Sequence, residues 1–336
     1  MRQLTADAVE RLLTHACSPK TVRAIEAGEG HQTLWETMEL SGFVDALVPE
    51  HAGGAGLSLA DASPVMELSG RHGVPLPLAE SMLLRALIHA SDAEVPLGSL
   101  TFGRKPRLEN GVVTCASVPC GKVADWVVVP DNGAARIISV GAAEAASSAF
   151  AVDATLSWPR EAWDRSPPLD LTVDLRLAEA LIRAAQLSGA LQAVLERTLD
   201  YANQRQQFGK PIGKFQAIQH QLAIMSEQVI AARMSAAMAV EQQDIFPDPL
   251  RVGIAKARAS AAAVEVAALA HSIHGAIGFT AEYDLQLWTR RLHAWRQAAG
   301  AEGYWNVRVG RLILDHHDQA SLDLLRQATT LPRQTL

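Results

Sequence analysis

A cationic residue, an aromatic residue and several helix-breaking residues stand close together in the stretch 205–213, RQQFGKPIG. Gly209, Pro211 and Gly213 cannot continue a helix, so the stretch predicts a tight bend between two helices. Such a bend places Arg205 at the C-terminal end of one helix and exposes backbone N–H groups at the start of the next. A guanidinium beside a helix N-terminus favours binding of a phosphate or a carboxylate. The alternative is an ordinary helix turn with a surface arginine and a capping glycine.

Two long segments with helical periodicity flank this bend. Apolar residues recur at spacings of three and four between Leu177 and Leu199, and again between Ile218 and Met238. This spacing is typical of amphipathic helices that bury one face. The C-terminal part as a whole predicts a bundle of long helices. The expected helices cover roughly 174–204, 213–243, 250–275, 283–299 and 302–325.

Two sequence blocks together point to a known family. The bend and its continuation, RQQFGKPIGKFQAIQHQLA, resemble the C-terminal helical domain of flavin-dependent acyl-CoA dehydrogenases, whose bend reads Arg-x-x-Phe-Gly followed by Phe-Gln. Residues 273–284, IHGAIGFTAEYD, are similar to the family's His-Gly-Gly-x-Gly-Phe-Thr element. The glycine-rich stretch 47–58 resembles a loop of the family's N-terminal domain that is chiefly structural, and Ser58 is expected to cap the helix that follows it. The resemblance is strongest over 185–300 and 43–70.

The expected fold class is mainly α with a small β domain, as in acyl-CoA dehydrogenases. Three domains are expected: an N-terminal helical domain (1–90), a reduced middle β domain (91–165) and a C-terminal domain like a four-helix bundle (166–336). The middle region has three runs rich in β-branched residues, 112–118, 126–130 and 135–140. Asn110-Gly111 and Asp131-Asn132-Gly133 punctuate them as hairpin turns, and five to seven strands are expected.

This middle region resembles the abbreviated domain of a subgroup of short family members, which often form hetero-oligomers. The Thr-Glu-Pro-x-Ala-Gly-Ser element, which longer members place beside the flavin, has no evident counterpart here. Direct contacts between this region and a flavin ring are therefore not expected.

Composition and charge exclude several classes of protein. The net charge is −6 and the basic residues are scattered, which argues against a nucleic-acid partner. The three cysteines have no metal-ligand spacing, and their odd number favours reduced thiols over a disulfide framework. No metal site is expected. The sequence has no run of eighteen apolar residues and no signal-like N-terminus, so a soluble, cytoplasmic protein without a membrane partner is expected.

The resemblance implies FAD as the cofactor. Arg205 matches the arginine that reaches the FAD pyrophosphate of a neighbouring subunit, Phe208 the aromatic that packs on the same cofactor, and Gln216 a polar contact to it. Gly275 and Gly278 match the glycines that let the backbone approach the ADP part. A homo-oligomer or a hetero-oligomer with a related chain is therefore expected.

The glycine block departs from the family pattern at two positions. Ala276 replaces the usual second glycine, where a methyl group would crowd a close backbone approach. Ser272 stands where a glutamine is common. His271, in the same block, is interpreted as a capping or core histidine.

The catalytic base is not evident from the sequence. Many family members place a glutamate twenty residues after the phenylalanine of the glycine block, and counting from Phe279 gives Ala299. Glu179 matches a position on the helix before the bend that some members use, and it is the preferred candidate. Glu302 lies near the usual place, but a glutamate in a first helical turn is also explained by the helix dipole. A base supplied by a partner subunit stays open.

The resemblance implies an enzyme that converts an acyl-CoA thioester to the 2,3-enoyl-CoA with bound FAD. Its electrons would pass to an electron-transfer flavoprotein. The alternative is a catalytically silent subunit that completes the flavin site of a related acyl-CoA dehydrogenase chain. No motif identifies the acyl group.

Overall fold

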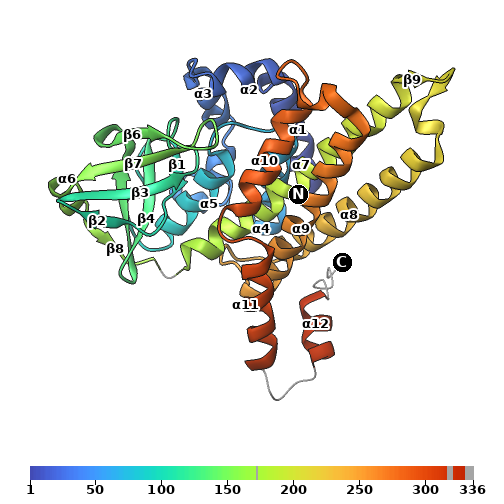
Figure 1. Cartoon of the computed structure of the whole chain (residues 1–336). Coiled ribbons are helices and arrows are strands. Elements are labelled where there is room, and N and C mark those ends of the chain that lie inside the picture. Colours follow the sequence, from blue (N-terminus) through green and yellow to red (C-terminus); the bar gives the residue numbers. More distant parts are fainter. Residues whose placement is uncertain (172, 316–320, 330–336) are drawn as a thin grey trace. The chain divides into compact units, whose positions relative to one another are not determined.

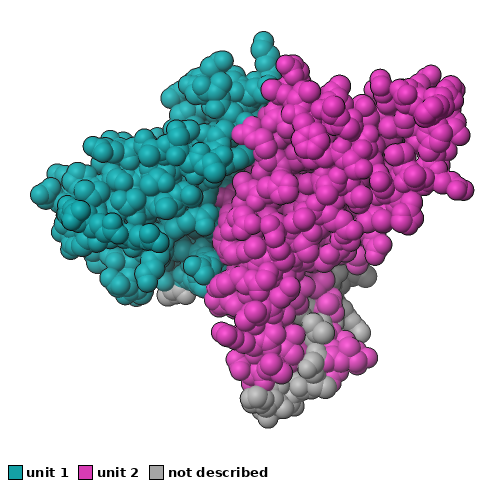
Figure 2. All heavy atoms as spheres, in the orientation of Figure 1, with its two compact units in different colours: residues 1–65, 74–179, 243–246 teal, residues 66–73, 180–242, 247–336 magenta. Residues whose placement is uncertain are grey.

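The computed structural model describes residues 1–171, 173–315 and 321–329. The chain forms two compact units, which are coloured separately in Figure 2. Unit 1 comprises residues 1–65, 74–179 and 243–246, and unit 2 comprises residues 66–73, 180–242 and 247–336. Most of the described chain is helical and eight of the ten strands, β1–β8, gather in one region, so the expected fold class is confirmed.

Unit 1 begins with short helices joined by tight turns (Figure 1). These are α1 (Arg2–Ala16), α2 (Pro19–Glu26), α3 (Gln32–Leu40), the start of α4 (Leu59–Arg71) and α5 (Leu78–His89), with short 3-10 turns at Phe43–Asp45 and Glu50–Ala52. Local sequence sets where the helices begin. The Oγ atoms of Ser18 and Ser58 accept hydrogen bonds from the backbone N–H groups of Thr21 and Asp61, both at 3.1 Å. The predicted cap at Ser58 is confirmed.

The glycine-rich loop at 47–58 folds back on itself. Gly54 donates its backbone N–H to the carbonyl of Pro49 (3.2 Å), and Gly56 donates to the carbonyl of Val48 (2.8 Å). A Cβ atom on Gly54 would lie 2.1 Å from the Val48 carbonyl oxygen, so only glycine fits there. Because these N–H groups are used within the loop, they are not available to cradle a phosphate.

The β domain of unit 1 consists of two four-stranded sheets. One has the order β1 (Leu100–Phe102), β4 (Trp126–Asp131), β5 (Ala134–Ser139) and β8 (Pro168–Leu169), with β1 parallel to β4. The other is antiparallel, with the order β2 (Arg107–Glu109), β3 (Val112–Val118), β7 (Ala154–Pro159) and β6 (Glu144–Ser147). A 3-10 turn at Val140–Ala142 and α6 (Arg160–Arg165) complete the domain. Residues of both sheets share one apolar core, which includes Val113, Val127, Ile138, Leu156 and Trp158.

The two predicted hairpin turns of this domain are confirmed. Asn110-Gly111 joins β2 to β3 with φ angles of +51° and +77°, and Asn132-Gly133 joins β4 to β5 with φ angles of +48° and +90°. Positive φ at both central residues defines the type I′ turn, whose twist matches that of paired strands. Asparagine tolerates this conformation better than most residues, which explains its place before each glycine.

Unit 2 is built from long helices. They are the greater part of α7 (Leu175–Gln204), α8 (Gln216–Val240), α9 (Pro249–His274), α10 (Leu285–Gln297), α11 (Glu302–Asp315) and α12 (Ser321–Thr329). The helix α9 is central, because α8, α10 and α11 all pack against it (Figure 1). The helix expected over 302–325 is represented by α11 and the start of α12, and residues 316–320 lie outside the described part of the chain.

The segment Pro249–Phe279, which contains α9, is long and apolar enough to cross a membrane by length and composition. The core helix of a soluble bundle passes the same test, so one such segment is weak evidence for a membrane span. In this fold α9 is packed by other helices, and its Gly253 allows close approach: a Cβ there would lie 2.7 Å from Val309 Cγ2 on α11. In the described structure, 44% of the most apolar window of this segment is buried.

Candidate functional site

The predicted bend between α7 and α8 is present and contains a small hairpin. The strands β9 (Gln206–Gln207) and β10 (Lys210–Pro211) pair in antiparallel register across a two-residue turn. Phe208 and Gly209 form that turn with φ angles of +51° and +76°, which is again a type I′ conformation. Sequence reasoning predicted the bend but not the strand pair, whose only signal is a glycine two residues before a proline.

The side chains of residues 205–210 in this bend are exposed to solvent, including that of the apolar residue Phe208. Phe208 is 92% exposed, and its ring makes an edge-on contact with the ring of Phe215, at 6.1 Å between centroids. Lys210 Nζ lies 4.4 Å from the Phe215 ring centroid. Arg205 is exposed, and no described residue forms an ion pair with its guanidinium. The bend therefore presents an aromatic ring and cationic groups to whatever binds there.

The start of α8 adds backbone donors to the same bend. Gln216 is the first residue of α8, is exposed, and follows a short 3-10 turn, η4, at Ile212–Lys214. The first N–H groups of an α-helix have no acceptor within the helix and carry the positive end of its dipole. The carbonyl of Phe215 satisfies the N–H groups of Ile218 and Gln219, both at 3.0 Å. A cation, an exposed amide and a helix N-terminus thus lie within one short segment.

The glycine block forms a single 3-10 turn, η5 (Gly275–Phe279), directly after α9. Gly275 has φ of +65° and ψ of −145°, a conformation that is essentially restricted to glycine, and it is exposed with open space where a Cβ would stand. Gly278 is buried. A Cβ there would lie 3.0 Å from His274 Cβ and 3.2 Å from His271 Nδ1, so internal packing accounts for this glycine.

Two histidines one turn apart hold the η5 turn. His271 accepts or donates a hydrogen bond at Thr289 Oγ1 (3.0 Å) and stacks on Phe279, with centroids 4.2 Å apart. His274 is buried, donates from Nδ1 to the carbonyl of Ala270 (2.8 Å) and stacks on Tyr201 at 4.3 Å. Desolvation lowers the pKa of both histidines, so both rings are neutral at physiological pH. Sequence reasoning assigned a capping or core role to His271, and its contacts are of that kind.

The turn between α10 and α11 contains the position where the resemblance led us to look for a base. Ala299 is only 4% exposed and has φ of +55°. Its carbonyl accepts a hydrogen bond from Trp305 Nε1 (3.1 Å). The fully buried Lys256, on α9, donates to the carbonyls of Arg296 (2.9 Å) and Gly300 (2.8 Å). The polar groups of this turn are thus engaged within the protein.

Comparison with known proteins identifies the family. The family pattern described as "Acyl-CoA dehydrogenase, N-terminal domain" matches residues 2–94, and "Acyl-CoA dehydrogenase, C-terminal domain" matches residues 177–313. The protein named acyl-CoA dehydrogenase IpdE2 of Mycobacterium tuberculosis is 30% identical over 87% of this chain and 91% of its own length. IpdE2 of Mycolicibacterium smegmatis is 32% identical over 89% of this chain and 94% of its own length.

The chain belongs to the acyl-CoA dehydrogenase family. It is therefore an oxidoreductase of a flavoprotein family. Among solved structures, the ChsE4-ChsE5 complex from Mycobacterium tuberculosis contains a chain of the same fold, with a TM-score of 0.79 and 23% identity over 92% of this chain and 96% of that one.

The two glutamates considered as the acyl-CoA dehydrogenase base have different surroundings. Glu179 is buried, with 4% of its surface exposed, and lies near the start of α7 between the buried Ala178 and Ala180. Glu302 is the first residue of α11 and forms a two-point ion pair with Arg296, through Nε (2.9 Å) and an Nη. This pairing lowers the pKa of Glu302, which makes it a weaker proton acceptor than an ordinary glutamate.

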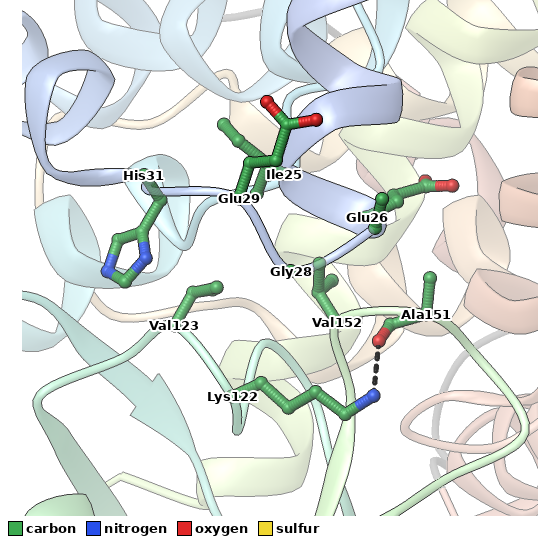
Figure 3. Close-up of a pocket in the computed structure, with 10 residues that line it drawn as sticks. Ile25, Glu26, Gly28, Glu29, His31, Lys122, Val123, Ala151 and Val152 are labelled. Atoms are coloured by element: carbon green, nitrogen blue, oxygen red, sulfur yellow. Dashed lines mark hydrogen bonds between the residues drawn. The ribbon is translucent and has the colours of Figure 1, made fainter.

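A cavity of about 170 Å³ in unit 1 is separate from every predicted site residue (Figure 3). The turn after α2 and the segments around Lys122 and Val152 line it. Lys122 Nζ is used by the carbonyl of Ala151 (2.8 Å), and the carboxylates of Glu26 and Glu29 point away from Lys122. The cavity therefore offers no converging set of polar groups. Within the described residues, no group of three His, Cys, Asp or Glu side chains is placed to hold a metal ion.

Proposed function

We propose that this chain dehydrogenates an acyl-CoA thioester to the 2,3-enoyl-CoA with FAD bound at the bend between α7 and α8. The observation that carries the proposal is the exposed bend in a member of this family, where Arg205, Phe208 and the start of α8 stand together. A pyrophosphate fits a guanidinium and a helix N-terminus, because both favour negative charge. Gly275 also fits the binding of FAD, because no atom of the described residues, its chain neighbours aside, lies within 4 Å of the position where a Cβ would stand.

The proposed roles divide the binding of FAD between two segments of the chain. Arg205 binds the pyrophosphate, Gln216 donates a polar contact at the start of α8, and Phe208 packs on the cofactor. Gly275 lets the backbone approach the ADP part, whereas Gly278 supports the turn from inside. When bound, FAD supplies the two-electron acceptor that takes the hydride from Cβ of the acyl chain.

Glu179 is the proposed base. Its carboxylate accepts the proton from Cα of the thioester, so that the Cα–H electron pair becomes the new double bond as hydride leaves Cβ. Burial keeps bulk water from the carboxylate, so that the proton it accepts comes from a bound substrate. Glu179 is preferred to Glu302 because it is buried, whereas Glu302 is partly exposed and its pKa is lowered by Arg296.

The site is proposed to be completed by a second subunit. By resemblance, Arg205 matches an arginine that reaches the cofactor of a neighbouring subunit. A phenylalanine 92% exposed at a strained turn also fits contact with another molecule. The solved structure titled ChsE4-ChsE5 complex is an assembly of two differently named chains. We further propose an electron-transfer flavoprotein as the electron acceptor and the cytoplasm as the compartment.

The proposal is tested by the visible spectrum of the purified chain and of two variants. The wild-type chain should carry flavin absorbance that an acyl-CoA substrate bleaches. Glu179→Gln should retain the flavin and lose bleaching by at least about a hundredfold in rate, because the general base contributes a factor of this size. Glu161→Gln, at an exposed glutamate on α6, is the matched control and should bleach normally.

Arg205→Ala tests the binding half of the proposal. This substitution should weaken FAD binding by about tenfold to a hundredfold, because a hydrogen bond between charged groups is lost. Arg290→Ala, at an exposed arginine on α10, should leave FAD affinity unchanged. Equal affinities of the Arg205→Ala chain and the wild type would remove Arg205 from the site.

A second function is favoured by the turn between α10 and α11. Its buried Ala299 and the engaged Glu302 leave no base where many family members carry one. The chain would then be a silent subunit that completes the flavin site of a related acyl-CoA dehydrogenase. A colourless chain that gains flavin only when purified with such a partner, with bleaching insensitive to Glu179→Gln, would decide for this function.

A further inference from the structure

We propose that Tyr201 is a positioning residue that couples the Arg205 bend to the η5 turn, so that the two segments act as one preorganised binding site. The proposal rests on the function proposed above, in which these segments hold the two parts of FAD. Tyr201 lies on α7, one turn before the bend, whereas η5 follows α9 some seventy residues later in the chain. A link between them must therefore be made by tertiary contacts.

The backbone of Tyr201 anchors the bend. Its carbonyl accepts the N–H of Arg205 at 2.8 Å, which forms the last turn before the chain leaves α7. The carbonyl of Arg205 in turn accepts the N–H of Ile212 at 2.8 Å, which closes the hairpin at its base. The orientation of the bend thus follows from the position of Tyr201.

The side chain of Tyr201 anchors the η5 turn. Its hydroxyl donates to the carbonyl of His274 at 3.3 Å. That carbonyl belongs to the last residue of α9, where helix geometry leaves acceptors without an intrahelical donor. The Tyr201 ring also stacks on the His274 imidazole, with centroids 4.3 Å and planes 23° apart. One side chain therefore fixes both the backbone and the ring of the residue directly before Gly275.

Further contacts make the link rigid. Tyr283, which follows η5, packs its ring against Tyr201 (6.1 Å, edge-on) and against His274 (5.3 Å). His271 holds the other end of the turn through its stack on Phe279. Each of these ring pairs adds a favourable interaction beyond the apolar area that it buries. The η5 turn is consequently fixed at both of its ends, and Tyr201 is the member of this set that also belongs to the bend.

Preorganisation of this kind raises affinity by reducing the ordering that binding requires. The Tyr201 hydroxyl thereby raises the affinity for FAD without contacting it. Sequence reasoning did not find Tyr201, because its two contacts lie on segments that only the fold brings together. Its position four residues before Arg205 is the only local signal.

Tyr201→Phe tests the coupling, because it removes the hydroxyl and keeps the ring on His274. The first measurement is hydrogen–deuterium exchange of the chain without added flavin. Peptides that cover 275–280 should exchange about tenfold faster in the variant, since the hydrogen bond at the end of α9 is lost. Tyr304→Phe is the matched control: its hydroxyl is bonded by Arg308 (3.0 Å) on α11, away from both segments, and η5 should exchange as in the wild type.

The second measurement is the dissociation constant of ADP, which contains only the pyrophosphate and adenosine parts, and that of FAD. It is made on the assembly as purified, at a temperature where wild type and variants are all folded. Tyr201→Phe should raise both constants by about tenfold, and Tyr304→Phe should raise neither. A lower melting temperature with unchanged exchange of η5 and unchanged affinity would show an ordinary structural role and overturn the proposal.

The outcomes separate this inference from the proposed function. If the wild type binds FAD and Tyr201→Phe changes neither exchange nor affinity, the coupling is wrong and the proposed function stands. If η5 responds to Tyr201→Phe but the wild-type assembly binds neither FAD nor ADP, the coupling stands and the proposed function fails.

Discussion

In unit 2, two bends each contain a non-glycine residue and a glycine with positive φ, but one of these non-glycine residues is exposed and the other is buried. After α7, Phe208 and Gly209 have φ angles of +51° and +76°, and between α10 and α11, Ala299 and Gly300 have φ angles of +55° and +100°. A residue other than glycine at positive φ is uncommon and persists when its surroundings impose the conformation or its function requires it. The comparison asks which of these two causes applies to each bend.

The surroundings give different answers for the two bends. At the α10–α11 turn, Ala299 is buried, and Lys256 and Trp305 bond to the carbonyls around it. The interior of the protein therefore imposes that conformation. At the α7–α8 bend, Phe208 is 92% exposed and packs on little of its own chain. Its conformation belongs to the type I′ turn of the β9–β10 hairpin, and the exposure of its ring is the feature that we propose for contact with another molecule.

The largest difference between the bends should be in the free energy of unfolding when the lysine at each bend is replaced by methionine. Lys256→Met removes a buried donor and leaves the carbonyls of Arg296 and Gly300 without it, so the free energy of unfolding should fall by about 2–4 kcal/mol. Lys210→Met loses only an exposed contact with the Phe215 ring, worth about 0.5–1 kcal/mol. Urea unfolding of both variants makes the measurement.

Equal losses of unfolding free energy for Lys256→Met and Lys210→Met would contradict the difference between the bends, because both bends would then depend on their lysines to the same extent. Lys20→Met, at an exposed lysine on α2, sets the scale for a surface substitution and should change stability by no more than about 0.5 kcal/mol.

Replacing the non-glycine residue with positive φ by asparagine should change stability in opposite directions at the two bends. Phe208→Asn should stabilise the chain by about 0.5–1 kcal/mol, because asparagine tolerates this conformation, as Asn110 and Asn132 do in the β-domain hairpins. The same variant should lose bound flavin if the ring packs on FAD as proposed. Ala299→Asn should destabilise by about 1–3 kcal/mol, because a polar amide enters a buried site.

Thermal unfolding and the ratio of flavin to protein, measured on the same samples, test this second contrast. A Phe208→Asn chain that is less stable than the wild type would show that the ring supports the fold. A more stable chain with undiminished flavin would show that the strain at Phe208 has another cause.

The sequence predicted the local features of both units and missed the tertiary ones. Asn-Gly pairs between β-branched runs encode their hairpins locally, so both turns were found, and the helix-breaking residues after Arg205 predicted the bend. Lys256 gave no signal, since a lysine in an alanine-rich helix is indistinguishable from a solvent-exposed one until its neighbours are known. Gly278 was assigned to the cofactor from the resemblance, whereas the fold gives it a packing reason against His271 and His274. The roles of Glu179 and Arg205 stay predictions.

The smallest expected effect concerns the ion pair beside the α10–α11 turn and depends on pH. Arg296 lowers the pKa of Glu302, so the pair adds stability above the pKa of an unfolded glutamate, about 4.3, and that stability is lost as the pH falls through the lower folded value. Both side chains are partly exposed, which limits the contribution to about 0.5–1 kcal/mol. Glu302→Gln should therefore be less stable than the wild type at pH 7, and the two should converge as the pH falls below the folded pKa of Glu302.

Urea unfolding of the wild type and Glu302→Gln across this pH range tests the pair, with Glu227→Gln, at an exposed glutamate on α8, as the control. A stability difference that stays constant from pH 7 to below the folded pKa of Glu302 would rule out the ion pair as its source. The same variant sharpens the comparison of the bends. If the α10–α11 turn is structural, Glu302→Gln should leave the rate of flavin bleaching within about twofold of the wild type, because a residue outside the catalytic site alters stability and not the chemical step. A large loss of bleaching would instead return the base to the α10–α11 turn, the place that the family resemblance implies.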